Sequence, residues 1–371
     1  MKTSVVKIPS RISLPPDKQT GIICYDASNQ YPQLIERLND SSGRSKSCVD
    51  TFAKFMSGDG FADPAFAKSV VGANGLIADK LLRHIAKSLA LYRGFALHIN
   101  FNLLGEITEI NPTPFKEWRL SADDEGNYTK KLKHYTDWGK ESYQRIRKDL
   151  IVEYDEFNPS KAVEQITEAG GIQNYKGQVY YFSLDGYAKY PKATIDPVIE
   201  DVASDAFAKE FRLNNLSTNF LAFYFLVTGK CEDDSERDTY KKMIAQFQGA
   251  DKAGRIIHVE KENDTDTFDL KKADIQDVDG LFELTEKSVM DGIRRPFKIP
   301  PVLLGDQVPG KLGATQQELT DAINAYNWFT LDDRNLIVEE VSKLMQYYFM
   351  PVNPSGNYSI KPLQATLTTG A

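Results

Sequence analysis

The sequence predicts an α+β fold: a mixed β-sheet carried beside helices, followed by a helical hairpin and a long C-terminal helix. Three observations predict it. From Phe95 to Phe101, large apolar residues alternate with smaller or polar ones, which is the two-residue period of a half-buried strand, and further short strands are predicted up to Ser183. On both sides of this region, apolar residues recur every three or four positions, as in amphipathic helices. Three prolines between residues 296 and 301 then separate two of the later helices, because proline lacks the amide hydrogen and clashes with the preceding turn.

Composition and charge narrow the class of protein. The chain has 371 residues, of which 41% are hydrophobic and 26% charged, so we expect a folded protein with two or three sub-domains. The longest apolar run, Phe220 to Thr228, is about half of the roughly 18 residues that span a bilayer, so we expect no membrane contact. The N-terminus lacks the apolar segment of a signal peptide, and the three cysteines (Cys24, Cys48 and Cys231) lie far apart, as in reduced intracellular proteins.

The first half of the chain contains the predicted sheet. Residues Met1 to Asn39 are punctuated by prolines and predict an arm or an irregular edge. Periodicity then predicts helices over Ser45–Phe55, closed by Gly58-Asp59-Gly60, and over Leu76–Tyr92. Predicted strands follow over Phe95–Phe101, Ile107–Ile110, a hairpin of Trp118–Leu120 with Tyr128–Trp138, and Gln178–Phe182.

The second half predicts helices around a small insert. A helix is expected over Thr194–Asn219, then an insert with a short helix over Asp233–Phe247 and a strand over Gly254–Val259, and then a helix from Val278 to Arg295. The proline-rich break leads into a loop, Asp306 to Ala314. Thr315 with Glu318 three residues later predicts a capping box, which opens a helix to about Met350 with a bend near Phe329 to Asp332.

Several possible catalytic or ligand-binding motifs fail on inspection. The run from Gly305 to Leu312 is close to a phosphate-binding loop, but Leu312 replaces the magnesium-binding hydroxyl and Pro309 removes an amide from the loop. The four histidines have no second histidine at metal-ligand spacing, and the aspartates from 264 to 269 lack the glycine of a calcium loop. The aromatic run Phe220 to Phe225 has no interleaved basic residues, which favours packing over base stacking. We therefore expect no enzyme activity, metal or cofactor.

Four stretches, taken in order, carry a resemblance to a known family: Ser47–Phe61, Ile107–Leu120, Gly177–Glu200 and Gly254–Gly305. Together they make the chain resemble the portal proteins of tailed bacteriophages over about residues 45 to 350. The last stretch is the most telling, because Gly254-Arg255-Ile256-Ile257-His258-Val259-Glu260 precedes Phe297-Lys298-Ile299-Pro300-Pro301-Val302-Leu303-Leu304-Gly305. Only about twenty residues follow Met350, so the helical crown of larger portals is expected to be small or absent.

The resemblance implies a division of the chain into eight parts. They are an N-terminal arm (1–44), an α+β wing (45–193), a first stem helix (194–219), a clip (220–273), a second stem helix (274–300), a tunnel loop (301–314), a long helix behind the loop (315–350) and a short C-terminal segment (351–371). It also implies a homo-oligomeric ring, commonly a dodecamer, at one capsid vertex, through which double-stranded DNA is packaged and ejected. The implied partners are the terminase large subunit, head–tail adaptor and neck proteins, and the major capsid protein. The implied location is the virion, and the host cytoplasm during assembly.

The candidate channel residues follow from this resemblance. The tunnel-loop candidates are Gln307, Val308, Pro309, Gly310, Lys311 and Leu312, and the basic residues near the loop are Arg294, Arg295 and Lys298. The net charge is −7, and the stretch from Glu260 to Glu286 alone holds ten acidic residues and three lysines. An acidic channel wall repels phosphate and keeps DNA mobile, whereas a few cations can touch it transiently. Lys311 also fits an ordinary surface lysine, and Arg294 and Arg295 fit pairing with acids of a neighbouring helix or subunit.

Two other functions stay open at this point. One is another ring-shaped capsid or neck component without a DNA-gating loop. The other is a metal-dependent enzyme acting on nucleic acid, which requires a cluster of carboxylates around magnesium.

Overall fold

The computed structural model describes residues 16–138, 146–185, 189–217, 223–228, 238, 255–260, 278–305, 315–350, 353 and 356–364. The chain divides into two compact units, of which one joins residues 1–199 with 292–371 and the other is formed by 200–291. The α+β class is confirmed. None of the helices within the described ranges combines the length and the apolar character that a membrane crossing requires.

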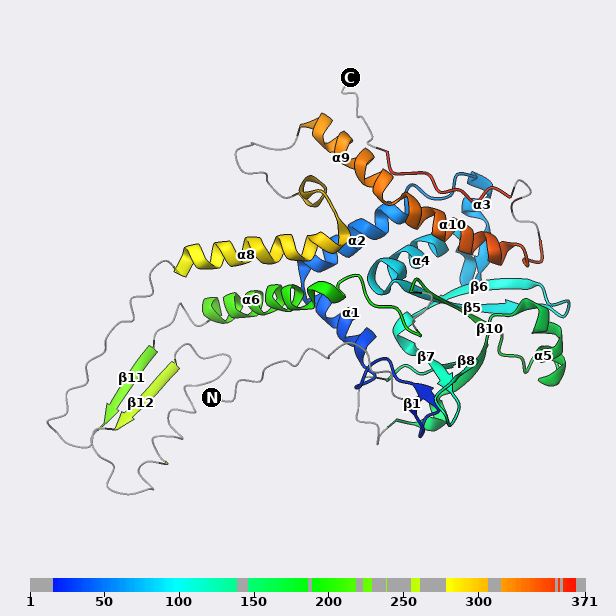
Figure 1. Cartoon of the computed structure of the whole chain (residues 1–371), viewed down its shortest axis with the longest axis horizontal. Helices are drawn as coiled ribbons and strands as arrows, with labels where there is room; N and C mark the ends of the chain where they lie inside the picture. The colour runs from blue at the N-terminus through cyan, green and yellow to red at the C-terminus, as the bar shows by residue number, and fades with distance from the viewer. Residues whose placement is uncertain are drawn as a thin grey trace. The chain divides into compact units, whose positions relative to one another are not determined.

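The larger unit is built on an eight-stranded mixed sheet (Figure 1). Its strands, in spatial order, are β1 (Pro16–Asp17), β2 (Ile22–Ile23), β7 (Trp118–Ala122), β8 (Tyr128–His134), β9 (Val152–Glu156), β10 (Gln178–Ser183), β5 (Gly94–Phe101) and β6 (Ile107–Thr113). All pairs are antiparallel except β9 with β10. The predicted strands and the hairpin after Trp118 are confirmed. β6 runs on through Pro112 to Thr113, past the predicted break at Asn111, because an edge strand tolerates the missing amide of a proline.

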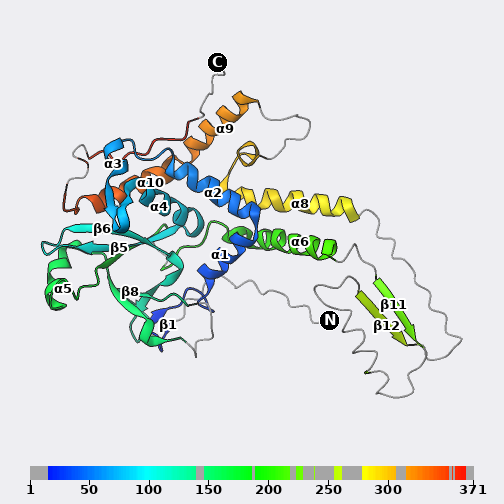
Figure 2. The same cartoon turned by 180° about the vertical axis from the view of Figure 1, so that it is seen from behind.

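Helices cover one face of this sheet in two layers. α4 (Ala78–Tyr92) packs directly on β5 and β6, and α2 (Gly43–Ser57) packs on α4. α10 (Leu331–Met345) lies against both α2 and α4, as Figure 2 shows from behind. The predicted helices over Leu76–Tyr92 and Ser45–Phe55 are confirmed within two residues at each end.

Shorter elements complete the larger unit. They are α1 (Tyr31–Ser41), α3 (Pro64–Lys68), β3 (Val70–Gly72), η1 (Ala73–Gly75), β4 (Leu76–Ile77), η2 (Phe115–Glu117), η4 (Lys148–Leu150), η5 (Pro159–Lys161), α5 (Ala162–Glu168) and η6 (Asp196–Val198).

Residues 16–41 do not form the expected arm, since they make β1, β2 and α1, whereas β1 does lie at one edge of the sheet. The cause is Arg119, whose guanidinium is fully buried and donates to the Asn29 carbonyl at 2.9 Å and to the Asn29 side-chain oxygen at 2.5 Å. Burial lowers the pKa of Arg119. The ring of Tyr25 stacks on Tyr190 at 4.1 Å and lies 5.7 Å from the guanidinium carbon. Long-range contacts of this kind hold the N-terminal segment against the sheet, and they cannot be predicted from a local sequence pattern.

The C-terminal segment folds back on the turn after α2. The Asp59 amide donates to the Lys361 carbonyl at 2.9 Å, and the Lys361 amide donates to the Gly60 carbonyl at 2.9 Å. Gly58 has φ 52°, and a Cβ there would lie 1.9 Å from the Lys361 carbonyl oxygen. Only glycine allows this close approach, which explains why the turn after α2 begins with Gly58.

The smaller unit contains α6 (Ile199–Ser217), which begins at Ile199 in the larger unit, the strands β11 (Phe223–Thr228) and β12 (Arg255–Glu260), and α8 (Val278–Arg294), which ends in the larger unit. β11 and β12 pair in parallel, from Phe223 with Arg255 to Thr228 with Glu260. The predicted strand and the two flanking helices are confirmed, although the first begins as the 3₁₀ turn η6. The predicted helix over Asp233–Phe247, apart from residue 238, lies outside the described residues, as does Cys231.

Candidate functional site: the base of the loop after Gly305

The tunnel-loop candidates fall between two described segments. Gln307, Val308, Pro309, Gly310, Lys311 and Leu312 lie outside the described residues, which stop at Gly305 and resume at Thr315. Arg294, Arg295 and Lys298 are described and lie just before the loop. The structure therefore defines the base of this loop, meaning residues 294–305 on one side and 315–334 on the other.

The N-terminal side of the base is a chain of tight turns. α8 ends at Arg294 and is followed by the 3₁₀ turns η7 (Arg295–Phe297) and η8 (Pro301–Leu304). Lys298 between them has φ 52°, and its amide donates to the Arg295 carbonyl at 3.1 Å. Gly305 then has φ 77° and ends η8. The three prolines thus end the α-helix, as predicted, and replace it with two 3₁₀ turns.

One buried aromatic residue anchors this side to the larger unit. Phe297 is 1% exposed, and its ring meets the ring of Phe52 from α2 edge-on at 5.9 Å. Its carbonyl accepts a hydrogen bond from the Tyr326 hydroxyl at 2.9 Å. The Tyr326 ring packs edge-on against Phe55 at 4.7 Å. Burial raises the pKa of Tyr326, so its hydroxyl stays protonated and remains a donor.

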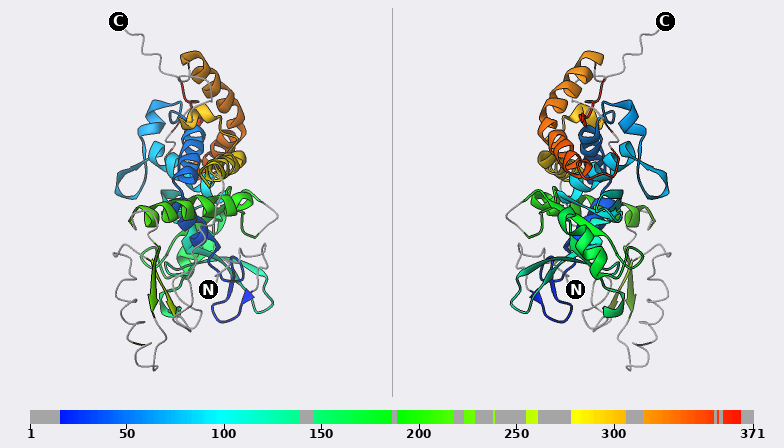
Figure 3. Two further views of the ribbon diagram at one scale, coloured as in Figure 1. Left: turned by 90° about the vertical axis from the view of Figure 1, so that its left-hand side faces the viewer. Right: turned by 90° about the vertical axis from the view of Figure 1, so that its right-hand side faces the viewer.

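The C-terminal side begins with the predicted capping box, which is confirmed. The Glu318 amide donates to the Thr315 hydroxyl at 3.2 Å, and the Thr315 amide donates to the Glu318 carboxylate at 3.1 Å. This box opens α9 (Gln316–Phe329). The predicted bend is confirmed at Thr330, where α9 gives way to α10, and Figure 3 shows the two helices turning alongside α2.

Arg334 holds the bend in place. It is 5% exposed, and its guanidinium donates to the Phe55 carbonyl at 3.0 Å, the Thr330 hydroxyl at 2.7 Å and the Asn327 carbonyl. Burial lowers the pKa of Arg334. Neither Arg334 nor Tyr326 was predicted from the sequence as part of a site. A signal was present for Arg334, because it stands four residues after Thr330 and three before Ile337, on the buried side of the helix.

The two sides of the base share this cluster. Phe297 precedes the loop and Tyr326 follows it, and the hydrogen bond between them joins the two segments directly. Both also contact α2, through Phe52 and Phe55. The segment before the loop and the helix after it are therefore joined to each other and to α2, at Phe297 eight residues before Gly305 and at Tyr326 eleven residues after Thr315.

The three basic residues near the loop have different environments. Arg294 is half-buried, whereas Arg295 and Lys298 are exposed. The Lys298 ammonium lies 4.7 Å from the ring centroid of Phe329, a cation–π distance that orients it along α9. Arg295 and Lys298 thus present two cations on the turns that lead into the loop. Within the described ranges, no three histidine, cysteine, aspartate or glutamate side chains converge as metal ligands.

Comparison with known proteins gives no family. No protein-family model and no curated protein matches the sequence. Among solved structures, the chain is similar to a chain in the virion of a native gene transfer agent particle, with 13% identity, a TM-score of 0.47, and coverage of 89% of this chain and 83% of that one. It is also similar to chains in the neck of the native particle with C12 symmetry (14%, TM-score 0.44, coverage 88% and 83%) and of the empty particle with C6 symmetry (12%, TM-score 0.43, coverage 90% and 85%). All three TM-scores lie below 0.5.

Proposed function

We propose that this chain is a structural component of a phage-like particle, and specifically a portal subunit. In this proposal, copies of the chain, commonly twelve, form a ring at one capsid vertex, and the ring borders the channel through which double-stranded DNA is packaged and ejected. The terminase large subunit, the neck proteins and the major capsid protein contact the ring. The subunit itself has no catalytic site. It resides in the virion, and in the host cytoplasm during assembly.

The observation that carries the proposal is the order of the elements. An α+β sheet unit is followed by a helix, a small β insert, a second helix, a proline-rich break, a loop and a bent helix pair. The four sequence stretches that resemble portal proteins fall on this same order, from α2 through β6 and β10 to η8. The order supports a subunit whose stem is α6 and α8, whose clip contains β11 and β12, and whose loop after Gly305 reaches into the channel.

The base of the loop supports the same use. A loop that touches moving DNA experiences force repeatedly, so the segments on either side of it need to be held firmly to the rest of the subunit. Phe297, Tyr326 and Arg334 supply such a support through buried hydrogen bonds and ring contacts. Arg295 and Lys298 are exposed beside it and can touch phosphates briefly. Two cations in a chain of net charge −7 favour transient contact over tight binding.

Imaging of the pure full-length chain tests the proposal. Negative-stain electron microscopy and native mass spectrometry should give closed rings with a central hole wide enough for a DNA duplex. Deletion of Val308 to Leu312 should leave the rings intact and impair DNA packaging or retention, because the base residues are kept. If the deletion instead abolishes assembly, the loop is an architectural part and its proposed role in the channel is wrong.

The two rival functions make different predictions. A ring-shaped neck or capsid component without a gating loop should package normally after the deletion of Val308 to Leu312. A metal-dependent enzyme should show magnesium-dependent nuclease or ATPase activity in the pure protein, and that activity would overturn the proposal.

A further inference from the structure

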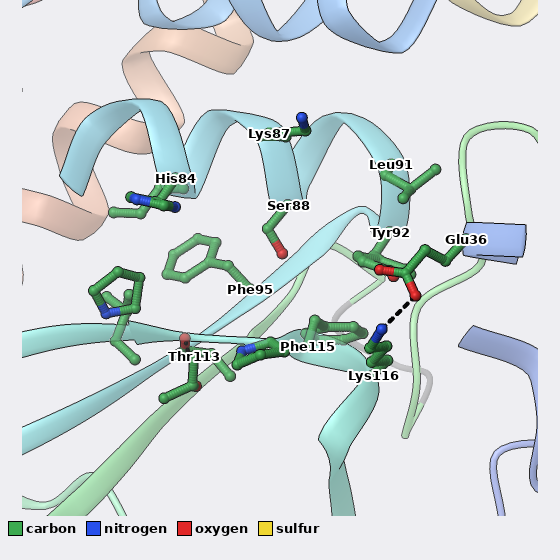
Figure 4. Close-up of a pocket in the computed structure, with 15 residues that line it drawn as sticks. Glu36, His84, Lys87, Ser88, Leu91, Tyr92, Phe95, Thr113, Phe115 and Lys116 are labelled. Carbon is green, nitrogen blue, oxygen red and sulfur yellow. Dashed lines mark hydrogen bonds and ion pairs between the residues drawn. The ribbon is translucent and has the colours of Figure 1, made fainter. Parts of the chain in front are cut away.

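A pocket opens between α4 and the sheet, away from the base of the loop. Its volume is about 370 Å³, which is in the range of pockets that hold a drug-sized ligand. Figure 4 shows the rings of Phe95 and Phe115 below α4 and the Ser88 hydroxyl directed into the space between helix and sheet. The Lys116 ammonium and the Glu36 carboxylate pair at 2.5 Å on one side. No residue of α9 or α10 lines the pocket, so those helices leave it open.

A row of basic side chains borders this pocket. The four exposed residues along α4 from residue 80 to 87 are Lys80, Arg83, His84 and Lys87. Their spacing of three, four and seven residues places them on one helix face. His84 and Lys87 also line the pocket itself. The Lys87 ammonium lies 3.6 Å from the Asp50 carboxylate, but both side chains are more than half exposed, so this pair leaves Lys87 available to another acid.

The bend between α9 and α10 carries exposed apolar side chains with acidic residues around them, opposite in charge to the basic row on α4. Trp328 is 77% exposed, and Leu331 three residues later is 43% exposed. The exposed acidic residues Asp321, Asp332 and Glu339 flank them along the two helices. An exposed tryptophan is costly to leave in water, and tryptophan is among the residues that dominate the binding energy of protein interfaces.

We propose that Trp328 and Leu331 of one copy insert into the α4 pocket of the next copy in the ring. The inference rests on the proposed function, because it names the contact between neighbouring subunits. In this contact Asp332 faces Lys87, and the pocket offers the Ser88 oxygen and the Glu36 carboxylate as acceptors for the indole amine. An apolar projection flanked by Asp321, Asp332 and Glu339, with Lys298 nearby on Phe329, thus meets an apolar pocket bordered by the basic row of α4 and by the Glu36–Lys116 pair.

The arrangement also fits the symmetry of a ring. A ring with rotational symmetry of three or more needs a contact made by two different surfaces of each subunit. The bend of α9–α10 and the α4 pocket are two such surfaces, since they belong to one unit and share no residue. A second copy of this chain is therefore the occupant that the charges and the ring symmetry favour.

Substitution in the full chain tests the contact. Trp328→Ala should weaken association at least tenfold in sedimentation-velocity analysis. Leu104→Ala is the matched control, because Leu104 is also 77% exposed but lies in the turn between β5 and β6, at the opposite end of these strands from the pocket residues 95–97 and 112–113. It should change association less than twofold. Equal weakening by both substitutions would assign the effect to general surface hydrophobicity and overturn the contact.

A charge exchange tests the polar part of the contact. Asp332→Lys and Lys87→Glu should each weaken association, and the double variant should recover most of the loss because the pair is restored with opposite signs. Additive losses in the double variant would contradict the pairing.

Photo-crosslinking separates this contact from the ring itself. With p-benzoylphenylalanine at position 328, crosslinks should form between copies and map to residues 84–97 or 112–116. Rings whose crosslinks map elsewhere would overturn the pocket contact and leave the proposed ring standing. A wild-type chain that remains monomeric would contradict both.

Discussion

Replacement of Tyr326 by phenylalanine probes the support of the loop with the least change in shape. The substitution keeps the ring, and with it the contacts at 4.7 Å to Phe55 and 5.8 Å to Phe329, so no cavity forms. It removes only the hydroxyl that donates to the Phe297 carbonyl at 2.9 Å. Phe297 is 1% exposed, so water cannot easily replace the donor. A buried acceptor left without its partner costs about 1–3 kcal/mol.

The expected effect is local opening of the turns before the loop. Since about 1.4 kcal/mol corresponds to a factor of ten, amide exchange in a peptide covering residues 295–305 should accelerate by roughly 5- to 150-fold. The reporters are the Lys298 amide, bonded to the Arg295 carbonyl, and the Gly305 amide, bonded to the Val302 carbonyl. Hydrogen–deuterium exchange followed by mass spectrometry measures both.

Tyr347→Phe is the matched control, because Tyr347 is 46% exposed and takes no part in the contact between Phe297 and Tyr326. It should leave exchange in residues 295–305 unchanged. If Tyr326→Phe exchanges no faster than this control, the hydrogen bond does not hold the loop base and the reasoning fails.

Three further predictions concern stability. Arg334→Met removes the donor to the Phe55 carbonyl and should lower the free energy of unfolding in urea by about 1–3 kcal/mol, whereas exposed Arg295→Met should change it by less than about 0.5 kcal/mol. Gly58→Ala brings a Cβ within 1.9 Å of the Lys361 carbonyl oxygen and should expose the C-terminal segment to trypsin. The control Gly356→Ala also changes a glycine with positive φ (63°), but its Cβ would have no atom within 4 Å, so it should not increase cleavage. Equal cleavage of both variants would contradict the packing of Lys361 on Gly58. Stability should also fall as pH rises above about 10, because unfolded tyrosines lose their protons there while burial raises the pKa of the folded ones, so the unfolded state binds fewer protons. Absorbance at 295 nm measures ionised tyrosine. We expect the part of its rise that comes from the buried tyrosines to coincide with unfolding; these are Tyr25, Tyr31, Tyr92, Tyr181, Tyr190 and Tyr326.

Local patterns in the sequence predicted most of the elements. Patterns in the sequence marked β5, β6, the β7–β8 hairpin and β10 but not β9 (Val152–Glu156), and the three- and four-residue period marked α2 and α4. The spacing of Thr315 and Glu318 predicted the capping box, because both of its hydrogen bonds form within four residues. These features depend on neighbours in sequence, so they can be read from it.

Contacts between distant segments could not be read in this way. The placement of β2 beside β7, about a hundred residues later, depends on packing around Arg119 and on the register of the sheet. The joining of Phe297 to Tyr326 likewise depends on where α2 places Phe52 and Phe55. The order of the predicted elements was sufficient to suggest the loop, whereas its support became visible only in three dimensions.

The most direct test of the central claim is a cryo-electron microscopy reconstruction of the assembled full-length chain. We expect a closed ring with a central opening that admits a DNA duplex and with residues 306–314 bordering that opening. A monomer, or a ring in which these residues lie on the outer rim, would contradict it.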